Sequence, residues 1–165
     1  MNILYALTIL AILQVSNAHL GVDSVAYKDF KRRIHLDNPA QGNYTVHNYT
    51  TKLDHFSPWN NRTFKLKYYN NSLYFKNDTG PIFLYICGES ACNPPKNSSS
   101  PVQLAIKLKA KLMALEHRYY GDSQPFNNSE GGWSIENMKY LTSKQAIEDI
   151  HGFIKSLRKT YGQDR

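Results

Sequence analysis

The chain has 165 residues, which suits one domain at most once a short leader is removed. Its formal net charge of +7 would suit a nucleic-acid partner, but the basic residues are scattered and only Lys31, Arg32 and Arg33 form a run. A solvated basic surface explains this charge better than nucleic-acid binding does.

Residues 1–18 have the pattern of a secretory signal peptide. They contain no charged side chain, and their apolar core from Ile3 to Val15 is too short to span a bilayer. Ser16 and Ala18 fit a small-residue cleavage site. No later segment is apolar enough to be a membrane span, so we expect a secreted or lumenal protein.

Two further features suit an oxidising, glycosylating compartment. Cys87 and Cys92 could close a small loop with each other or pair with other partners, and their spacing offers too few ligands for a metal site. Seven N-x-S/T sequons follow the leader and predict a glycoprotein. They begin at Asn43, Asn48, Asn61, Asn70, Asn77, Asn97 and Asn127.

Residues 19–44 have no clear periodicity and are interpreted as the mature N-terminal segment; 45–165 are expected to be the folded region, at most one domain in length and not a complete one. In 45–76, β-branched and aromatic residues alternate with polar ones, which predicts two or three antiparallel strands. A loop is expected at Ser57–Asn61, and a turn at Asn70–Asn71, because Asn tolerates positive φ.

From Gly80 onward the pattern changes. Six consecutive apolar residues, Ile82 to Cys87, predict a strand covered on both faces, as in a parallel sheet. Ser100 is expected to cap a helix over 101–110 that has Pro101 in its first position. The stretch Lys111–Leu115 predicts a second buried strand.

The last segment predicts the clearest helix of the chain. Thr142 and Gln145 have the spacing of a capping box. One apolar stripe follows, made of Ala146, Ile147, Ile150, Phe153, Ile154 and Leu157. Gly152 within this helix suggests close packing against a sheet. The order is an antiparallel β segment followed by β-α-β-α, which predicts an α/β fold with a parallel sheet.

The chain lacks the G-x-S-x-G pattern of a nucleophile elbow. Ser90 comes closest to it, and Ser123 is interpreted as a turn residue. Asp54 and His55 are adjacent, so on a strand they would point to opposite faces, and a structural role with one side chain bonded to the backbone is favoured.

The cluster Glu116-His117-Arg118 ends the second buried strand. Glu116 and Arg118 are expected on one face, in a buried structural network rather than in direct catalysis.

The motifs LEHRYYGDSQPF, LDHF, GPIFLYICGE and MKYLTSKQAIEDI resemble the family of lysosomal Pro-X carboxypeptidase, dipeptidyl peptidase 2 and thymus-specific serine protease over roughly residues 47–160. This resemblance implies the N-terminal half of an α/β-hydrolase fold. It also implies that the Ser, Asp and His of the triad lie beyond Arg165, so that the chain is incomplete and inactive alone.

The resemblance also implies site residues within the chain. The loop after Ile82–Cys87 would supply an oxyanion-hole amide from Gly88 or Glu89, although a cysteine stands where family members usually have a glycine. Glu89 would face the substrate cleft, where it could bind a free amine or a cleft arginine, or would bond structurally to a loop amide. Glu116, His117 and Arg118 would have a supporting role.

The favoured function is therefore that of a serine-type exopeptidase, secreted or lysosomal, acting on proline-containing peptides without a cofactor or metal; a homodimer is possible for the full-length protein. The alternatives are a non-catalytic secreted glycoprotein that binds peptides or a protein partner, and a fragment without independent function. Carboxypeptidase and dipeptidyl peptidase action are not distinguished.

Overall fold

The computed structural model describes residues 44–75, 80–127 and 131–162, which all fall within one compact unit, Asn38–Arg165. The expected signal peptide, and the segment 19–44 apart from Tyr44, lie outside the described residues. The elements in chain order are β1 Thr45–Lys52, β2 Thr63–Asn71, β3 Ile82–Ile86, α2 Ser100–Leu108, β4 Lys111–Leu115, α3 Ile135–Met138 and α4 Ser143–Thr160.

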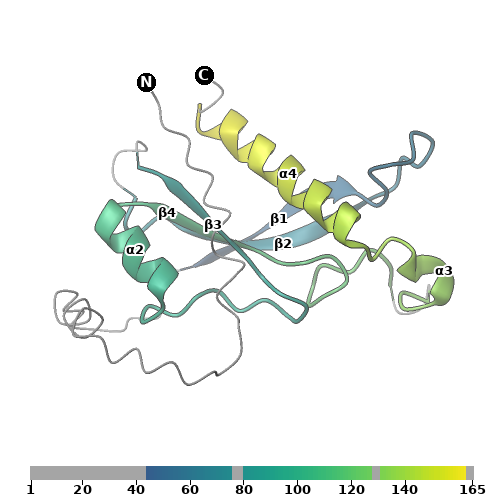
Figure 1. Ribbon diagram of the computed structural model, residues 1–165, viewed down its shortest axis with the longest axis horizontal. Helices are drawn as coiled ribbons and strands as arrows, with labels where there is room; N and C mark the ends of the chain where they lie inside the picture. The colour runs from purple at the N-terminus through teal and green to yellow at the C-terminus, as the bar shows by residue number, and fades with distance from the viewer. Residues whose placement is uncertain (1–43, 76–79, 128–130, 163–165) are drawn as a thin grey trace, which may run out of the picture. The chain divides into compact units, whose positions relative to one another are not determined.

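The strands form one four-stranded mixed sheet in the order β1-β2-β4-β3 (Figure 1). β1 pairs with β2 and β2 with β4 in antiparallel fashion, whereas β3 and β4 are parallel and joined through α2. The predicted α/β class and the predicted succession of antiparallel and then parallel strands are confirmed. The strand order is compatible with part of an α/β-hydrolase-like sheet.

The predicted turn at Asn70–Asn71 is wrong, because β2 continues through both residues. Asn70 is paired with Thr45 of β1, and Asn71 with Leu112 of β4. Two neighbouring strands thus hold this segment extended despite the low strand propensity of Asn. The turn comes afterwards, where the Asn71 side chain accepts a hydrogen bond from the Leu73 amide at 2.9 Å.

The two parallel strands differ in burial. Every residue of β4 is buried, as predicted, since this strand has neighbours on both sides. β3 was expected to be covered on both faces, but its residues are half-buried and Ile86 is exposed. The reason is that β3 lies at the edge of the described sheet, with only one neighbouring strand.

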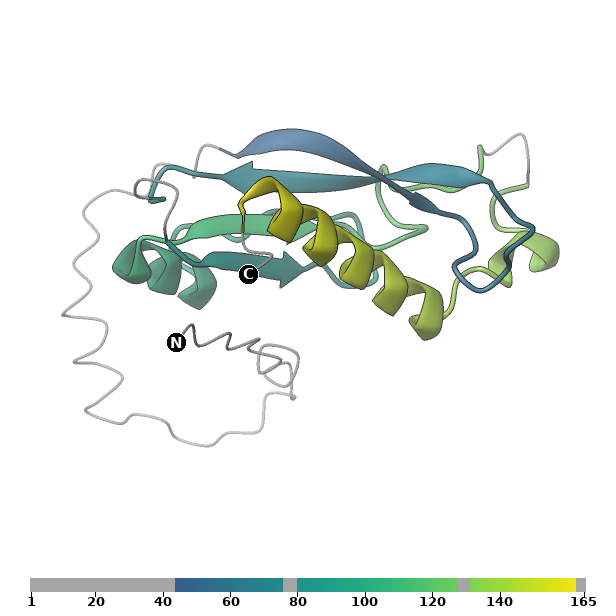
Figure 2. The ribbon, with the colours of Figure 1, turned by 90° about the horizontal axis from the view of Figure 1, so that it is seen from above.

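Successive side chains of β4 point alternately to the two faces of the sheet and so pack into two different cores, as the two-residue period of a strand requires. Met113 and Leu115 pack with Phe64, Leu66 and Phe153 of α4. Leu112 packs with three buried residues in and just after α2, namely Val102, Ala105 and Ala110. The two long helices therefore cover opposite faces of the sheet; the succession of elements can be followed in Figure 2.

The helix ends depart from expectation in detail. α2 begins at Ser100 rather than 101, and its N-cap is Ser99, whose side chain makes no capping hydrogen bond. In α4, Thr142 Oγ1 accepts a hydrogen bond from the Gln145 amide at 3.3 Å, as predicted. The Gln145 side chain instead binds Asp54 and the His55 amide, so the capping box is only half made. Ile147, expected in the buried stripe, is exposed.

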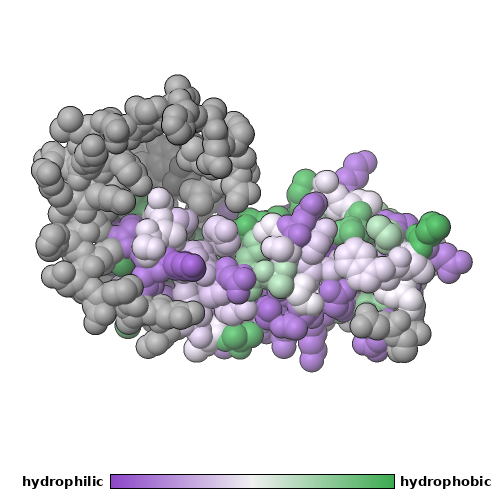
Figure 3. Space-filling view, turned by 90° about the horizontal axis from the view of Figure 1, so that it is seen from below, coloured by the Kyte–Doolittle hydropathy of each residue, from purple (hydrophilic) through white to green (hydrophobic). Residues whose placement is uncertain are grey.

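Apolar side chains on the face shown in Figure 3 occur in small groups among polar ones. Among the described residues, the most exposed large apolar side chains are Trp59 and Ile135, which lie on a loop and in the short helix α3. In the part of the chain that the structure describes, no helix is long and apolar enough to cross a membrane.

Gly152 allows α4 to lie close to β1, because a Cβ at this position would lie 2.8 Å from Tyr49 Oη. We expect Gly152→Ala to lower stability despite its gain of about 1 kcal/mol in helix propensity, since overpacking costs about 1–3 kcal/mol. In a Tyr49→Phe background, which lacks the hydroxyl, the same change should raise stability. Urea unfolding of the four variants measures both effects; the same sign in both backgrounds would contradict the packing argument.

Candidate active-site scaffold

The predicted functional residues lie around the carboxyl ends of the parallel strands β3 and β4. A small pocket is present there, lined by both strand ends and by the first turns of α4. Its lining includes Ile86, Leu115, Glu116, Arg118, Ala146 and Asp149. Ligands of open α/β sheets bind outside the carboxyl ends of the strands, so this edge is where substrate-contacting groups are expected.

The loop after β3 is closed by a disulfide between Cys87 and Cys92. Both ends of this loop are fixed to the sheet. The Cys87 amide donates to Leu115 O at 3.0 Å, and the Tyr69 hydroxyl donates to Cys92 O at 3.1 Å. Both cysteines are buried, whereas residues 88–91 between them are exposed. The loop therefore has fixed ends and an open tip.

Gly88 and Glu89, the predicted oxyanion-hole and cleft residues, lie in this tip. Within the described part of the chain, their N–H groups donate to no acceptor, and the Glu89 carboxylate has no hydrogen-bond or ion-pair partner. The structural bond from Glu89 to a loop amide, one of the two expected arrangements, is not formed there. A Cβ at Gly88 would meet nothing within 4 Å, so its backbone is open to an approaching group.

The carboxylate of Glu116 binds the other end of the loop. Oε1 accepts from the Cys92 amide at 2.9 Å and lies 3.0 Å from Lys67 Nζ. Oε2 accepts from the Asp122 amide at 3.0 Å and from the Ser123 hydroxyl at 2.7 Å. Since the residue is 1% exposed and a carboxylate accepts about four hydrogen bonds, its capacity is filled.

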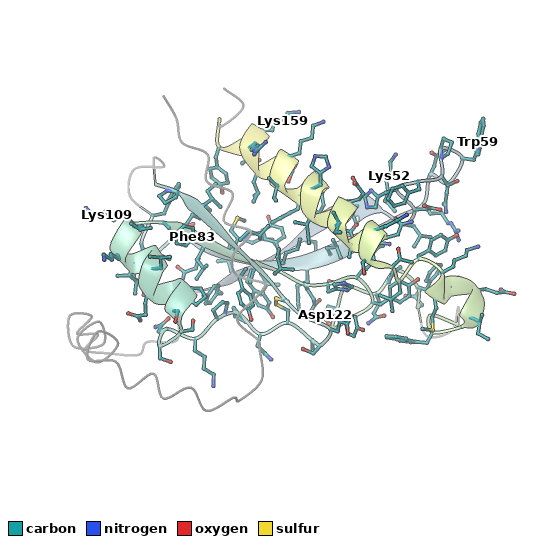
Figure 4. The ribbon with its side chains drawn as sticks, viewed as in Figure 1. Lys52, Trp59, Phe83, Lys109, Asp122 and Lys159 are labelled. Atoms are coloured by element: carbon teal, nitrogen blue, oxygen red, sulfur yellow. A yellow bond between two sulfur atoms is a disulfide. The ribbon has the colours of Figure 1, made fainter. Side chains whose placement is uncertain are left out.

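Lys67 supplies the charge opposite Glu116. Its ammonium also bonds to Asp122 Oδ2 at 2.8 Å, at the turn after β4 where Figure 4 labels Asp122. Burial by itself lowers the pKa of Lys67, but the bonds to Asp122 and Glu116 outweigh it and raise this pKa above its usual value. The lysine therefore stays charged and offsets the cost of burying the carboxylate.

Arg118 is the centre of a second buried network. Nε and Nη2 donate to the two oxygens of Asp149 at 2.6 and 2.9 Å, a bidentate pair. The remaining donors bind three backbone carbonyls, those of Lys52, Leu53 and Tyr140. All five N–H groups of the guanidinium are thus used.

His55 joins the same carboxylate but forms no catalytic triad with it. Its Nε2 lies 2.8 Å from Asp149 Oδ1 and 3.4 Å from Thr51 Oγ1. A relay needs both ring nitrogens, one toward the acid and one toward the nucleophile. Here one nitrogen faces both groups, and the Thr51 hydroxyl itself donates to Asp149. The cluster is therefore structural.

Asp54 and His55 were expected to point to opposite faces of a strand, and this expectation is wrong. They follow the end of β1 at Lys52, so strand alternation does not apply, and both side chains contact α4. Asp54 accepts from Gln145 Nε2 at 2.7 Å and from its neighbour Phe56 N at 3.0 Å. These two bonds lower the pKa of Asp54, and the second is the backbone bond expected for this pair.

Glu116 and Arg118 are both buried, as expected of a structural network, but they do not share a face. β4 ends at Leu115, and the chain turns at Arg118 and Tyr119, the latter at a φ of 71°. Glu116 therefore keeps the alternation of the strand, whereas Arg118 reaches α4. His117 is half-buried between them, and its Nδ1 lies 2.8 Å from Arg118 O.

The two serines considered as nucleophiles lie apart from any base. Ser90 is exposed in the tip of the disulfide loop, and its amide donates to Gly88 O at 2.8 Å. Ser123 is fully buried, with its hydroxyl donating to Glu116 and accepting from the Lys67 amide. In the described residues, no serine is hydrogen-bonded to a histidine, and no group of His, Cys, Asp and Glu could hold a metal ion.

The sequons differ in accessibility. Asn48, Asn61 and Asn127 are exposed, whereas Asn70 and Asn97 are half-buried. Asn43 and Asn77 lie outside the described residues. Glycosylation at all seven positions remains a prediction, and among the five described sequons the exposed three are the most accessible acceptors.

Asp149 and Lys67 were not singled out from the sequence. A signal for Asp149 was present, because it lies three residues after Ala146 and four before Phe153, on the apolar stripe of its helix. A charged residue within such a stripe needs a buried partner. Lys67 carried no comparable signal, since it alternates with Phe64 and Leu66 like a solvent-facing strand residue.

Loss of the Asp149 charge should be costly, because it leaves the Arg118 guanidinium buried without a counter-ion. We expect Asp149→Asn to lower the free energy of unfolding by roughly 3–5 kcal/mol. Asp122→Asn is the matched control, since its side chain is 80% exposed and its ion pair with Lys67 is screened by solvent. Chemical denaturation measures the free energy of unfolding of both variants. Equal losses in Asp149→Asn and Asp122→Asn would contradict the view that the buried Arg118–Asp149 pair stabilises the fold more than the exposed Lys67–Asp122 pair.

Comparison with known proteins assigns these residues to a family. The chain is 40% identical over 140 residues to the probable serine protease EDA2 of Arabidopsis thaliana, covering 84% of this chain and 26% of that protein. It is 36% identical over 122 residues to human lysosomal Pro-X carboxypeptidase, covering 72% and 24%. It thus spans about a quarter of the length of these relatives. The sequence model of serine carboxypeptidase S28 matches residues 51–165, so the chain belongs to the serine carboxypeptidase S28 family.

Proposed function

We propose that these residues form the N-terminal part of a serine-type exopeptidase, with the disulfide loop supplying part of its oxyanion hole. The observation that carries the proposal is the position of Gly88 and Glu89. They lie just beyond the parallel strand β3, after Cys87, are exposed, and have N–H groups without an acceptor in the described part of the chain. An amide after the third strand is a standard oxyanion donor of α/β-hydrolases.

The chemistry proposed is acyl transfer. A serine oxygen attacks the scissile carbonyl carbon, and its proton passes to a histidine while the carbonyl oxygen gains the negative charge. The N–H groups of Gly88 and Glu89 would hold this oxyanion. The C–N bond then breaks as the amine takes the proton, and water releases the acyl group in a second cycle of the same steps. One such donor lowers the barrier by about 2.7–4 kcal/mol.

The reacting side chains themselves are proposed to come from residues beyond Arg165. Among the described residues, no hydroxyl, imidazole and carboxylate are arranged as a triad, and His55 and Asp149 are already used in the Arg118 network. On this proposal residues 19–165 are a scaffold that is inactive alone.

The substrate class follows from the free carboxylate and from the relatives. An exopeptidase must bind a charged chain end, and the unpaired Glu89 carboxylate suits an α-amine or a cleft arginine. One relative is named for cleavage at Pro-X bonds and for the lysosome. We propose proline-containing peptides as substrates, a lysosomal or secreted location, and no cofactor.

The assignment is tested by expressing residues 19–165 and the longest natural form of the protein in a secretory host. We expect the longest form to hydrolyse short peptides with a proline next to the cleaved bond, and to be labelled by a fluorophosphonate that reacts with activated serines. Residues 19–165 should do neither. Turnover by residues 19–165 would contradict the proposed position of the triad. A longest form that binds such peptides without labelling or cleavage would favour a non-catalytic binding protein.

The role of Glu89 is tested in the same longest form. Glu89→Gln removes the charge and keeps the shape, so KM for peptides with a free α-amine should rise about tenfold while kcat stays within about twofold. Blocking the amine of the substrate should abolish the difference between variant and wild type. Glu136→Gln, an exposed residue of α3, is the matched control and should leave both constants unchanged. An unchanged KM for the Glu89 variant would contradict amine binding.

A further inference from the structure

Two loops at the carboxyl edge of the sheet are bound to a single carboxylate. One is the disulfide loop 87–92 after β3, and the other is the turn 119–123 after β4. We infer that Glu116 is a positioning residue: its carboxylate fixes the loop 87–92, and with it the free N–H groups of Gly88 and Glu89, relative to the turn 119–123. This inference rests on the proposed function only where it concerns the reaction.

The contact with the disulfide loop determines the position of its far end. The near end, Cys87, is held by the backbone of β4 through Leu115 O. The far end, Cys92, has its N–H on Glu116 Oε1 at 2.9 Å. Because the disulfide joins these two ends, movement of Cys92 would carry the whole tip 88–91 with it. The Tyr69 hydroxyl of β2 also donates to Cys92 O at 3.1 Å, so Glu116 is the charged one of the two side chains that hold this end of the loop against the sheet.

The contact with the turn is equally specific. Oε2 of Glu116 binds the Asp122 amide and the Ser123 hydroxyl. Gly121 has a φ of 53°, and a Cβ there would lie 2.0 Å from Glu116 Oε1. The turn thus packs directly against the Glu116 carboxylate, and it has a glycine at the position where a side chain would collide with that carboxylate. Glu116 fits both loops as one unit.

A carboxylate suits this position better than a neutral side chain would. All four partners of Glu116 are donors: two backbone amides, a hydroxyl and the Lys67 ammonium. Glutamine has one acceptor oxygen and two amide hydrogens, so at least one N–H would face a donor here. Replacing Glu116 by Gln therefore leaves the volume nearly unchanged, removes the charge that faces Lys67, and breaks at least one of the four contacts.

The inference is tested by hydrogen–deuterium exchange on the longest natural form of the protein. In Glu116→Gln, exchange of the Cys92 amide and of the peptide 88–93 should rise about tenfold, as loss of a hydrogen bond to a charged group implies. Amides of the β1–β2 pair should stay within about twofold. Glu148→Gln is the matched control, since among the described residues the Glu148 side chain pairs only with His151, which is 69% exposed, and it should change neither region.

A second variant covers the case in which Glu116→Gln does not fold. Ser123→Ala removes one bond to Glu116 Oε2. In the described residues, the Ser123 side chain makes no hydrogen bond to the disulfide loop. If the carboxylate couples the two loops, Ser123→Ala should raise exchange at Cys92 about threefold. A change confined to residues around Ser123 and Lys67 would overturn the coupling. A uniform rise over all strands in either variant would assign Glu116 to global stability alone.

Activity gives a separate readout. In a form that hydrolyses peptides, Glu116→Gln should lower kcat about tenfold or more and change KM less than about twofold, since oxyanion donors act in the transition state. An unchanged kcat would overturn the positioning role. If exchange at Cys92 rises as expected but no form of the protein cleaves peptides, the anchoring of the loop stands and the proposed peptidase function falls.

Discussion

The buried guanidinium of Arg118 is the constraint on which the described domain depends. A guanidinium can be buried only if its charge is balanced and its five N–H groups are bonded. The partners that meet this demand come from three separate segments. They are the backbone carbonyls at the end of β1, the backbone carbonyl of Tyr140, and the carboxylate of Asp149 in α4. One side chain thus sets the position of α4 against the first strand, and the pocket at the strand ends lies beside this contact.

Two charged networks leave β4 on opposite sides within three residues. Glu116 turns toward the disulfide loop and Lys67, whereas Arg118 turns toward α4. The chain between them cannot rotate without breaking one network, because Glu116 and Arg118 are both buried and fully bonded. The turn 119–123 is therefore fixed from both faces of the sheet. This explains how a loop region without secondary structure can keep a defined geometry next to a proposed active site.

The sequence predicted what local patterns determine and missed what tertiary neighbours decide. The buried strand Lys111–Leu115 and the Thr142 cap were predicted because an apolar run and a capping residue carry their own signal. Asn70 and Asn71 were predicted as a turn because Asn by itself favours turns. Their extended conformation comes from pairing with strands on both sides, which the local sequence does not reveal. For the same reason the partners of Glu116 and Arg118 could not be predicted: Cys92 and Asp149 lie 24 and 31 residues away.

The arrangement separates the task of holding an oxyanion from the task of attacking a carbonyl. Oxyanion donors are effective only if they are oriented before the charge forms, because reorientation during the reaction would cost part of the stabilisation. An exposed four-residue tip has no packing to hold it, and a glycine at its start adds freedom. The disulfide limits this freedom from within the loop, and Glu116 limits it from the sheet. Backbone amides at Gly88 and Glu89 can therefore stay open to a substrate and still be fixed in place.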